Sequence, residues 1–391
     1  MRILLCNKYY YRRGGDCSYT LGLESLLKSE GHEVAVFAMD HPETEHTEWR
    51  KYFPPEVNLD SFKSKLGMFV RSMGYGSTRS RFLALMDDFK PQIVHLGNIH
   101  SQLSPVIAEL ASKKGAGVVW TMHDYKLLCP RYDCLRPGAG NCELCFTDKK
   151  NVLKYSCMKN SRAASMIAYL EAIKWSVSRL ELCTDAFICP SHFMLSKMQQ
   201  GGFEAEKLHH ICNFIDSSSC QREDYSERED YYCYVGRLSG EKGIATLTQV
   251  AAELPYKLKV LGDGPLRQSL PHSENIEYLG RKDWGEVKDI VGKARFIVIP
   301  SEWYENNPLS VIEALSLGTP VLGARIGGIP ELIDDWSGAC FESGSMVSLK
   351  TQLKYMFGRP FDYERIADAS QQRFSAKKYY SQLMEVYSRL K

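Results

Sequence analysis

The chain has no long apolar run: nowhere in its 391 residues does a stretch approach the roughly 18 apolar residues that a membrane-spanning helix needs. A signal-peptide pattern is also missing, because the N-terminal MRILLC enters a predicted strand directly. The net charge is only +2, and we expect no nucleic-acid partner. A hydrophobic fraction of 44% and a charged fraction of 25% are typical of a soluble globular protein. We therefore expect a cytoplasmic protein.

The sequence also lacks a dinucleotide-binding fingerprint. The segment RRGGDCSYT places Gly14 and Gly15 before a predicted helix, but its spacing is not GxGxxG, which disfavours an NAD enzyme. Backbone N–H groups at such glycines can reach a phosphate or an acceptor, and a plain connection between elements is the alternative. No Asp-x-Asp metal motif is evident, so we expect no catalytic metal.

Strand-like apolar runs alternate with helical stretches, as a parallel doubly wound α/β sheet requires. In the first half these runs fall at residues 2–6, 33–38, 92–96, 117–122 and 186–189. After Asn213 the pattern restarts with YYCYV, KLKVLG, IEYLG, RFIVIP and PVLGA. The chain is long enough for two such domains, and the polar segment Asp216–Asp230 is the predicted linker.

This pattern predicts two Rossmann-like domains. The first covers residues 1–215 and carries a cysteine-rich insertion at 129–157. The second covers residues 216–375. An amphipathic helix within residues 376–391 closes the chain.

Two carboxylates, Glu305 and Glu313, lie eight residues apart around a predicted helix start. Pro308 suits the first turn of that helix, where its missing N–H would be unsatisfied anyway. The free backbone N–H groups of Leu309 and Ser310 then offer a site for a phosphate or a sugar hydroxyl. The alternative is a solvated pair of acids that flank an ordinary amphipathic helix.

Two cations follow a predicted strand in the segment GRLSGEKG. Arg237 and Lys242 precede a helix that starts near Ile244, so both point beyond the carboxyl end of the sheet, where ligands bind in open α/β folds. Preorganised cations at such a point stabilise negative charge, such as that of a phosphate group. The alternative is a surface loop in which the cations pair with Glu241.

These motifs, E-x7-E followed by EALxxGxPVxxxxxGGxPE, resemble the retaining nucleotide-sugar glycosyltransferases of family 4. The resemblance implies a GT-B fold, in which two Rossmann-like domains face a central cleft and the last helix packs back on the first domain. It also implies that Glu305 contacts the donor sugar and Glu313 binds the nucleotide ribose. Many members have Pro-Phe-Gly after the first Glu, whereas this chain has Asn306, Asn307 and Pro308.

The resemblance extends to several loops that would line the cleft. It implies that Arg237 and Lys242 bind the donor diphosphate and that His123, which follows the strand GVVWTM, approaches the donor sugar. A satisfied structural histidine is the alternative for His123. The remaining positions that the resemblance assigns to the donor or to the cleft are Gly14, Gly15, Asp16, Gly236, Gly262, Gly264, Arg281, Asn307, Pro308, Leu309, Ser310 and Glu313.

The family transfers a sugar from a nucleoside diphosphate to an acceptor hydroxyl with retention, which implies a nucleoside-diphosphate-sugar donor and a sugar or lipid-linked acceptor here. Synthesis of cell-surface polysaccharide or lipid-linked oligosaccharide is the common setting among bacterial relatives. The leaving phosphate can take the acceptor proton, so Glu305 is assigned to positioning and charge stabilisation. The alternatives are an epimerase or hydrolase of the same fold, or a non-catalytic protein that binds sugar nucleotides.

Five cysteines fall between residues 129 and 157 in a loop rich in glycine and proline. Four thiolates in such a loop suit a structural zinc ion, although a single C-x2-C is a moderate signal. The loop resembles that of a bacterial subgroup of family 4, which implies a zinc set of Cys129, Cys142, Cys145 and Cys157. Unlinked thiols are the alternative, and a reducing cytosol disfavours a disulfide.

A basic stretch with interspersed aromatic residues follows the cysteines. It could rest on an anionic membrane as a peripheral contact of the first domain and meet a lipid-linked acceptor there, while a solvated basic helix is the commoner explanation. Its members are Lys149, Lys150, Lys154, Tyr155, Lys159, Arg162, Tyr169, Lys174, Trp175 and Arg179.

Overall fold

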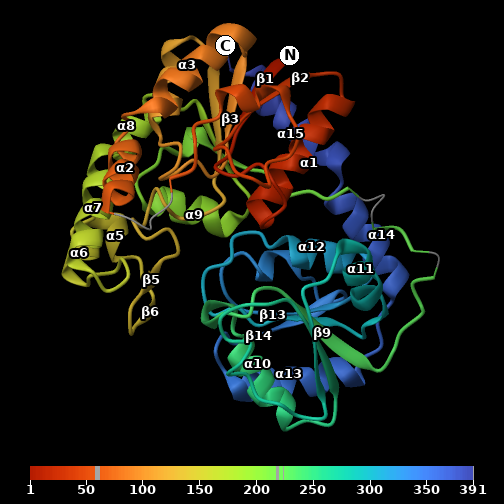
Figure 1. Cartoon of the computed structure of the whole chain (residues 1–391). Helices are drawn as coiled ribbons and strands as arrows, with labels where there is room; N and C mark the ends of the chain where they lie inside the picture. Colours follow the sequence, from red (N-terminus) through yellow and green to blue (C-terminus); the bar gives the residue numbers. More distant parts are fainter. Residues whose placement is uncertain (58–61, 217–219, 223, 391) are drawn as a thin grey trace. The chain divides into compact units, whose positions relative to one another are not determined.

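The computed structural model describes residues 1–57, 62–216, 220–222 and 224–390, with the side chains of 62–65 left aside. The chain divides into two compact units (Figure 1). The first unit comprises Met1–Cys212 with Tyr380–Lys391, and the second comprises Asn213–Tyr379. Residues 217–219 and 223 of the predicted linker lie outside the described residues.

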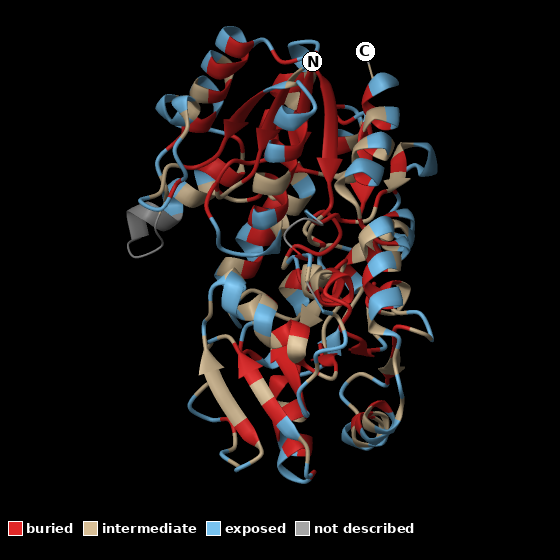
Figure 2. Ribbon diagram, turned by 90° about the vertical axis from the view of Figure 1, so that its right-hand side faces the viewer, coloured by how far each residue is buried: buried red, intermediate tan, exposed pale blue. Residues whose placement is uncertain are grey.

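The first unit is built on a six-stranded parallel sheet in the order β2-β1-β3-β4-β7-β8. The strands are rich in apolar residues on both faces because helices cover a parallel sheet on both sides, and Figure 2 shows them largely buried. Their bounds are β1 Arg2–Cys6, β2 Glu33–Phe37, β3 Ile93–Leu96, β4 Gly117–Thr121, β7 Ala186–Cys189 and β8 Leu208–His210.

Helices connect these strands, and a short antiparallel hairpin of β5 (Leu135–Arg136) and β6 (Gly140–Asn141) projects from the cysteine-rich loop. The helices before that loop are α1 Gly15–Ser29, α2 Phe62–Ser72, α3 Ser77–Phe89 and α4 Val106–Lys113. Those after its start are α5 Leu144–Thr147, α6 Asn151–Lys154, α7 Arg162–Lys174, α8 Val177–Glu181 and α9 His192–Gln200.

The second unit has its own six-stranded parallel sheet in the order β11-β10-β9-β12-β13-β14. Its strands are β9 Tyr231–Val235, β10 Lys257–Leu261, β11 Ile276–Gly280, β12 Ile297–Ile299, β13 Val321–Ala324 and β14 Gly338–Phe341. Its helices are α10 Ile244–Ala252, α11 Trp284–Lys293, α12 Leu309–Ser316, α13 Met346–Gly358 and α14 Tyr363–Arg373. Both sheets confirm the predicted doubly wound α/β class.

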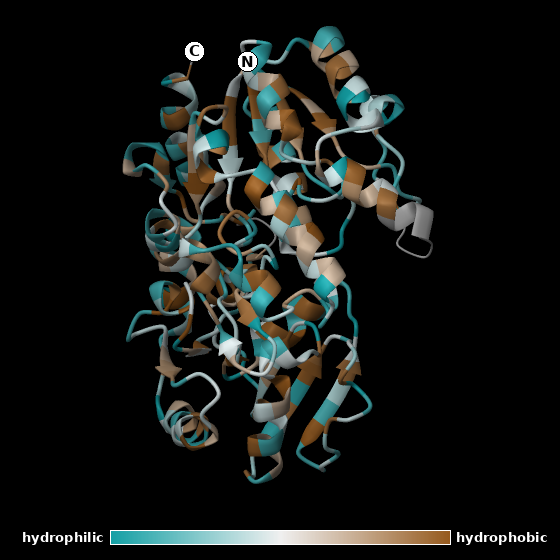
Figure 3. Cartoon of the chain, turned by 90° about the vertical axis from the view of Figure 1, so that its left-hand side faces the viewer, coloured by the Kyte–Doolittle hydropathy of each residue, from teal (hydrophilic) through white to brown (hydrophobic). Residues whose placement is uncertain are grey.

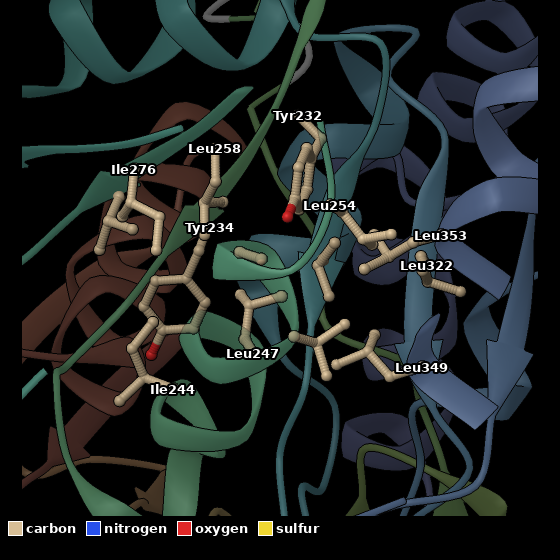
Figure 4. Close-up of a cluster of buried hydrophobic side chains, with 14 of the residues drawn as sticks. Tyr232, Tyr234, Ile244, Leu247, Leu254, Leu258, Ile276, Leu322, Leu349 and Leu353 are labelled. Atoms are coloured by element: carbon tan, nitrogen blue, oxygen red, sulfur yellow. The ribbon is translucent and has the colours of Figure 1, made fainter. Parts of the chain in front are cut away.

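The core of the second unit lies where α10 and α13 cover the sheet. Leu247 of α10 and Leu349 of α13 are fully buried beside Leu258 of β10 (Figure 4). Tyr234 is also buried there, and its hydroxyl donates a hydrogen bond of 2.8 Å to the backbone oxygen of Arg237. The core therefore anchors the loop that follows β9.

The last helix, α15 (Ala376–Ser388), completes the buried interior of the first unit. The Tyr387 hydroxyl lies 2.5 Å from His95 Nδ1, and His95 Nε2 lies 2.7 Å from the hydroxyl of Thr121. Burial lowers the pKa of His95 to about 3, so the imidazole is neutral and can share both hydrogen bonds. No helix in the described parts of the chain is long and apolar enough to cross a lipid bilayer.

Replacing Tyr387 by Phe should destabilise the first unit by about 1–3 kcal/mol, because it leaves a buried His95 nitrogen without a partner. Urea unfolding followed by tryptophan fluorescence would measure the change. Tyr380→Phe is the matched control, since the Tyr380 hydroxyl contacts the partly buried His32. Equal stability of the two variants would contradict a stabilising role for the His95 contact.

Candidate functional site

The sequence-predicted site residues of the second unit gather where its strand order reverses. Strands β9 and β12 are neighbours, but the chain continues from β9 to β10 on one side of this pair and from β12 to β13 on the other side. In open α/β folds such a point opens a crevice at the carboxyl ends of the strands, and ligands bind there. The loop after β9 carries Arg237 and Lys242, and the loop after β12 carries Glu305.

Three donors hold one oxygen of the Glu305 carboxylate. Lys242 Nζ lies 2.6 Å from Glu305 Oε1 and forms an ion pair with it. The hydroxyl of Ser301 and the indole N–H of Trp303 donate to the same oxygen at 2.8 and 2.9 Å. Among the described residues no donor engages the other oxygen, Oε2. The arrangement therefore orients the carboxylate and leaves one oxygen for a ligand.

Glu305 is 92% buried, its exposed fraction being 8%. Burial alone would raise its pKa, but Lys242, Trp303 and Ser301 outweigh the burial and hold the pKa below its usual value. The group is therefore a carboxylate at neutral pH. A fixed negative charge of this kind can stabilise positive charge that develops on a sugar ring.

Two glycines from the GG motif shape the backbone around Glu305. Gly328 N donates to the Glu305 carbonyl oxygen at 2.8 Å. Gly327 has a φ of +59°, and a Cβ there would lie 2.1 Å from that same oxygen. Only glycine fits, so the GGIPE segment holds Glu305 in place through the main chain.

Glu313 lies in the second turn of α12, which begins at Leu309 and ends at Ser316. Pro308 stands just before the helix, as its N-cap, and not in the first turn. The Glu313 carboxyl group has no hydrogen-bond or ion-pair partner in the described parts of the chain, and burial raises its pKa to about 7. An acceptor group without a donor in this place is suited to the hydroxyls of a ribose.

The alternative interpretation of the loop after β9 was a surface loop whose cations pair with Glu241, and the contacts of Lys242 differ from it. Glu241 accepts a hydrogen bond from the Ser239 hydroxyl at 2.6 Å, whereas Lys242 pairs with Glu305. Arg237 is exposed at the start of this loop. Gly243, at a φ of +66°, lets the loop pass so close to Pro300 that a Cβ would lie 1.8 Å from the Pro300 carbonyl oxygen.

The glycines of GDGP, Gly262 and Gly264, allow the loop after β10 to pack closely against the loop after β9. A Cβ on Gly262 would lie 1.9 Å from Gly236 O, and one on Gly264 would lie 2.5 Å from Leu238 O. These glycines let the loop after β10 lie directly against the loop that carries the cations. Arg281 follows β11, two strands away from β9, and is exposed.

Asn307 has a structural partner. Its side-chain oxygen accepts a hydrogen bond of 3.0 Å from Asn213 N, and its carbonyl oxygen accepts one of 2.9 Å from the Asn213 side chain. Asn307 is buried, with 6% of its surface exposed. These contacts tie the first residue of the second unit to the loop after β12.

The first unit brings its own predicted residues together. Helix α1 begins at Gly15, with Gly14 as its N-cap, so the backbone N–H groups of both are at the helix start. Asp16 Oδ2 accepts a hydrogen bond of 3.1 Å from the Asn98 side chain. His123, two residues beyond the end of β4, lies close enough to Asp16 for their charges to interact.

Burial lowers the pKa of His123 to about 4, although the nearby Asp16 acts in the opposite direction. The imidazole is therefore neutral at physiological pH, and its ring meets Tyr19 edge-on at 4.5 Å. His123 Nε2 is buried without a hydrogen-bond partner in the described residues. A buried nitrogen without a partner is suited to a ligand hydroxyl.

The structure does not support the predicted zinc set. In the described part of the chain no group of three or more His, Cys, Asp or Glu side chains could hold a metal ion. Cys129 has a side-chain hydrogen bond with Cys134, which the predicted set of Cys129, Cys142, Cys145 and Cys157 left out. A hydrogen bond from Cys134 lowers the pKa of Cys129 to about 7. The five cysteines between residues 129 and 157 are free thiols.

Ser301, Trp303 and the two glycines at 327 and 328 are the site residues that the sequence analysis did not assign. Ser301 and Trp303 have no recognisable spacing relative to Lys242, so no signal pointed to them. The GG pair was part of the family motif, and its position after β13 would have indicated a backbone contact.

Two family models match the chain. The model described as Glycosyltransferase Family 4 matches residues 14–219, and the model described as Glycosyl transferases group 1 matches residues 220–373. The first model by itself spans more than half of the chain.

Curated relatives include two bacterial proteins. An "uncharacterized 42.6 kDa protein in cps region" of Klebsiella pneumoniae is 27% identical over 357 residues, which cover 85% of this chain and 87% of that protein. The lipopolysaccharide 1,6-galactosyltransferase of Escherichia coli is 27% identical over 222 residues, which cover 52% of this chain and 61% of that protein.

Solved structures share the fold of the whole chain. Anabaena Alr3699/HepE, in complex with UDP, has a TM-score of 0.71 at 16% identity, and the likeness covers 100% of both chains. Sucrose-phosphate synthase from Thermosynechococcus elongatus has a TM-score of 0.72 at 16% identity, covering 100% of this chain and 98% of that one. The likeness confirms the predicted GT-B class of fold.

Glu313 predicts a pH dependence of stability. Its folded pKa of about 7 lies above the ordinary value of 4.5, so its contribution is fully present below about pH 4.5 and is lost as the pH rises through about 7. Glu313→Gln removes this titration, and the variant should gain stability relative to the original protein between pH 5 and pH 8. Urea unfolding at both pH values would measure it. A constant difference between the two proteins would contradict the raised pKa.

Proposed function

The chain belongs to glycosyltransferase family 4, and from this premise we propose that it transfers a sugar from a nucleoside diphosphate to an acceptor hydroxyl with retention of configuration. The observation that carries the proposal is the single oxygen of Glu305 held by Lys242, Ser301 and Trp303. In this contact a fixed carboxylate and a cation lie together at the point where the strand order of the doubly wound sheet reverses.

The donor would bind to the second unit. We assign the diphosphate to Arg237 and Lys242, with the backbone N–H groups of Leu309 and Ser310 at the start of α12 as further donors. Glu313 would accept hydrogen bonds from the ribose hydroxyls, which would offset the cost of its burial. Glu305 would use Oε2 to bind a hydroxyl of the donor sugar.

The reaction breaks the bond between the anomeric carbon and the diphosphate oxygen and forms one between that carbon and the acceptor oxygen. Negative charge grows on the leaving diphosphate, where Arg237 and Lys242 stabilise it. Positive charge grows on the sugar, where the anionic Glu305 stabilises it. The acceptor proton passes to the leaving phosphate, so this proposal needs no strong protein base.

In the first unit we assign His123 to a hydroxyl of the donor sugar, since its neutral imidazole has a buried nitrogen without a partner. The start of α1, with Gly14, Gly15 and Asp16, is assigned to the donor phosphates or the acceptor. These assignments rest on the family resemblance together with the geometry within this unit.

The acceptor class is proposed from the relatives. A Klebsiella protein from a cps region and an Escherichia coli lipopolysaccharide galactosyltransferase both resemble this chain. We therefore propose a sugar acceptor in cell-surface polysaccharide or lipid-linked oligosaccharide synthesis. A uridine diphosphate sugar is the first donor to test, because Alr3699/HepE was solved with UDP and with UDP-glucose.

An assay with labelled UDP-, GDP- and ADP-sugars separates the candidate functions. A transferase releases the nucleoside diphosphate only when an acceptor is present, and NMR of the product gives the anomeric configuration. Release without acceptor would indicate a hydrolase, and sugar isomerisation without release an epimerase. Binding without any turnover would indicate a non-catalytic protein. The family assignment favours the transferase over all three.

Arg237→Ala should lower turnover by about 10²-fold or more, or roughly 2.7 kcal/mol of barrier, because the leaving diphosphate loses a preorganised cation. The fold should be unaffected because Arg237 is exposed. Arg295→Ala is the matched control, since it removes the same charge just before the amino end of β12, away from the carboxyl ends of the strands. Near-normal transfer by the Arg237 variant would remove the main assignment.

A further inference from the structure

Helix α7 presents an apolar face outward and a small, polar face inward. Met166, Ile167, Leu170 and Ile173 are exposed by 46, 40, 40 and 53%. The buried positions of the same helix are Ser165, Ala168 and Glu171. A surface helix ordinarily buries its apolar stripe and exposes its polar residues, so α7 has the reverse orientation. Four large apolar side chains on one face indicate an interaction surface.

Helix α2 extends this apolar surface. Its Leu66 and Val70 are exposed by 54 and 39%, and Tyr75, just beyond its end, by 62%. The ends of the two helices are in contact, because the Trp175 indole N–H donates to Ser72 O at 2.8 Å and Lys174 donates to the backbone oxygen of Met73. We call these seven side chains the α2–α7 surface: Leu66, Val70, Tyr75, Met166, Ile167, Leu170 and Ile173.

Both helices are visible on one side of the first unit in Figure 1, and Figure 3 turns that side toward the viewer with hydrophobic residues in brown. The basic end residues of α7 belong to the same face. At about 100° per residue, Arg162, the four apolar positions and Lys174 fall within an arc of roughly 140°.

A buried ion pair prevents α7 from turning its apolar face inward. Lys126 Nζ lies 2.9 Å from Glu171 Oε2, and the side chains are only 12 and 8% exposed. Ser165 adds a hydrogen bond of 3.1 Å from Met158 N to its hydroxyl. Rotating the helix would separate the buried charges, which is strongly unfavourable. The apolar exposure is therefore a fixed property of the fold.

The surroundings of the apolar stripe are basic. Residues 144–174 contain six Lys and Arg residues but only two acids, Asp148 and Glu171. Glu171 is already paired with Lys126. Among the described residues, four exposed cations of this segment have no acidic partner, and these are Lys150, Lys154, Lys159 and Arg162. The electrostatic character of the region therefore favours an anionic partner.

We propose that the α2–α7 surface docks on an anionic lipid bilayer, with α7 lying along the interface. An apolar stripe flanked by Lys and Arg is the pattern of interfacial helices, and each basic residue near an anionic leaflet adds to the attraction. The 13 residues of α7 are too few to span the hydrocarbon core of about 30 Å. A second copy of the chain is disfavoured, because a two-fold interface would bring this basic region against itself.

The proposal stands independently of the proposed function, since it concerns a surface and not the donor site. It has a direct test in vesicle flotation with the full chain. The protein should bind vesicles of phosphatidylcholine with phosphatidylglycerol and bind vesicles of phosphatidylcholine alone at least tenfold more weakly. Added salt should weaken the binding, because the attraction to the headgroups is screened.

Two variants separate the apolar and the charged contributions. Ile167→Ser, Leu170→Ser and Ile173→Ser together should lower binding at least tenfold, and thermal unfolding should stay unchanged because these side chains are exposed. Lys154→Ala, Lys159→Ala and Arg162→Ala together should abolish the preference for phosphatidylglycerol. Val347→Ser is the matched control, since Val347 is an exposed valine of the second unit with 79% of its surface accessible.

Several outcomes would overturn the proposal. These are the absence of vesicle binding by the unaltered protein, equal binding by the triple serine variant, and equal loss of binding in Val347→Ser. Self-association that the serine variant abolishes, without any vesicle binding, would assign the surface to a second copy of the chain. Capture of an acidic polypeptide in place of vesicles would assign it to a protein partner.

Discussion

The arrangement of the second unit depends on how one buried carboxylate is held. Taking Glu305 out of water is unfavourable unless donors compensate, and Lys242, Ser301 and Trp303 supply them at a single oxygen. Lys242 comes from the loop after β9, whereas the other two come from the loop after β12. The contact therefore joins two loops that are far apart in the sequence. Gly243 and Gly327 leave room for it, because a Cβ at either position would collide with the backbone of the loop after β12.

The two acids of this region differ because their surroundings differ. Glu305 has three donors and a lowered pKa, while Glu313 has none among the described residues and a pKa raised to about 7. One is therefore a permanent charge, and the other is an acceptor whose charge depends on what binds to it. His123 adds a third state in the first unit, an imidazole that burial keeps neutral. The surroundings of each group therefore decide whether it supplies a charge, a hydrogen-bond acceptor or a neutral polar atom.

Local signals in the sequence were sufficient for most of the fold. The apolar runs predicted the central strands, and Pro308 with the glutamate spacing predicted α12 to within a residue at its start. The strands β8 and β14, at the ends of the two sheets, were not predicted, because their sequences, LHH and GACF, contain few large apolar residues. The family motif predicted Glu305 as a candidate site residue.

What the sequence could not predict are contacts between distant segments. Lys242 and Glu305 are 63 residues apart, and no periodicity relates them. Asn307 was assigned to the donor sugar, yet its side chain contacts Asn213. The outward apolar face of α7 was also missed. Its sequence is amphipathic only weakly, and which face is buried depends on Lys126, which lies outside the helix.

The contact between α15 and the first unit has a consequence for biosynthesis. Tyr387 follows the whole second unit in the sequence, yet it contributes to a buried hydrogen-bonding network around His95 of the first unit, 292 residues earlier. On the ribosome, the N-terminal unit emerges long before this tyrosine is made. The network around His95 is therefore complete only after the second unit has been translated, so the unit that is translated first is not finished first. Translation that stops after the second sheet would leave the N-terminal unit with one nitrogen of His95, Nδ1, without its hydrogen-bond partner.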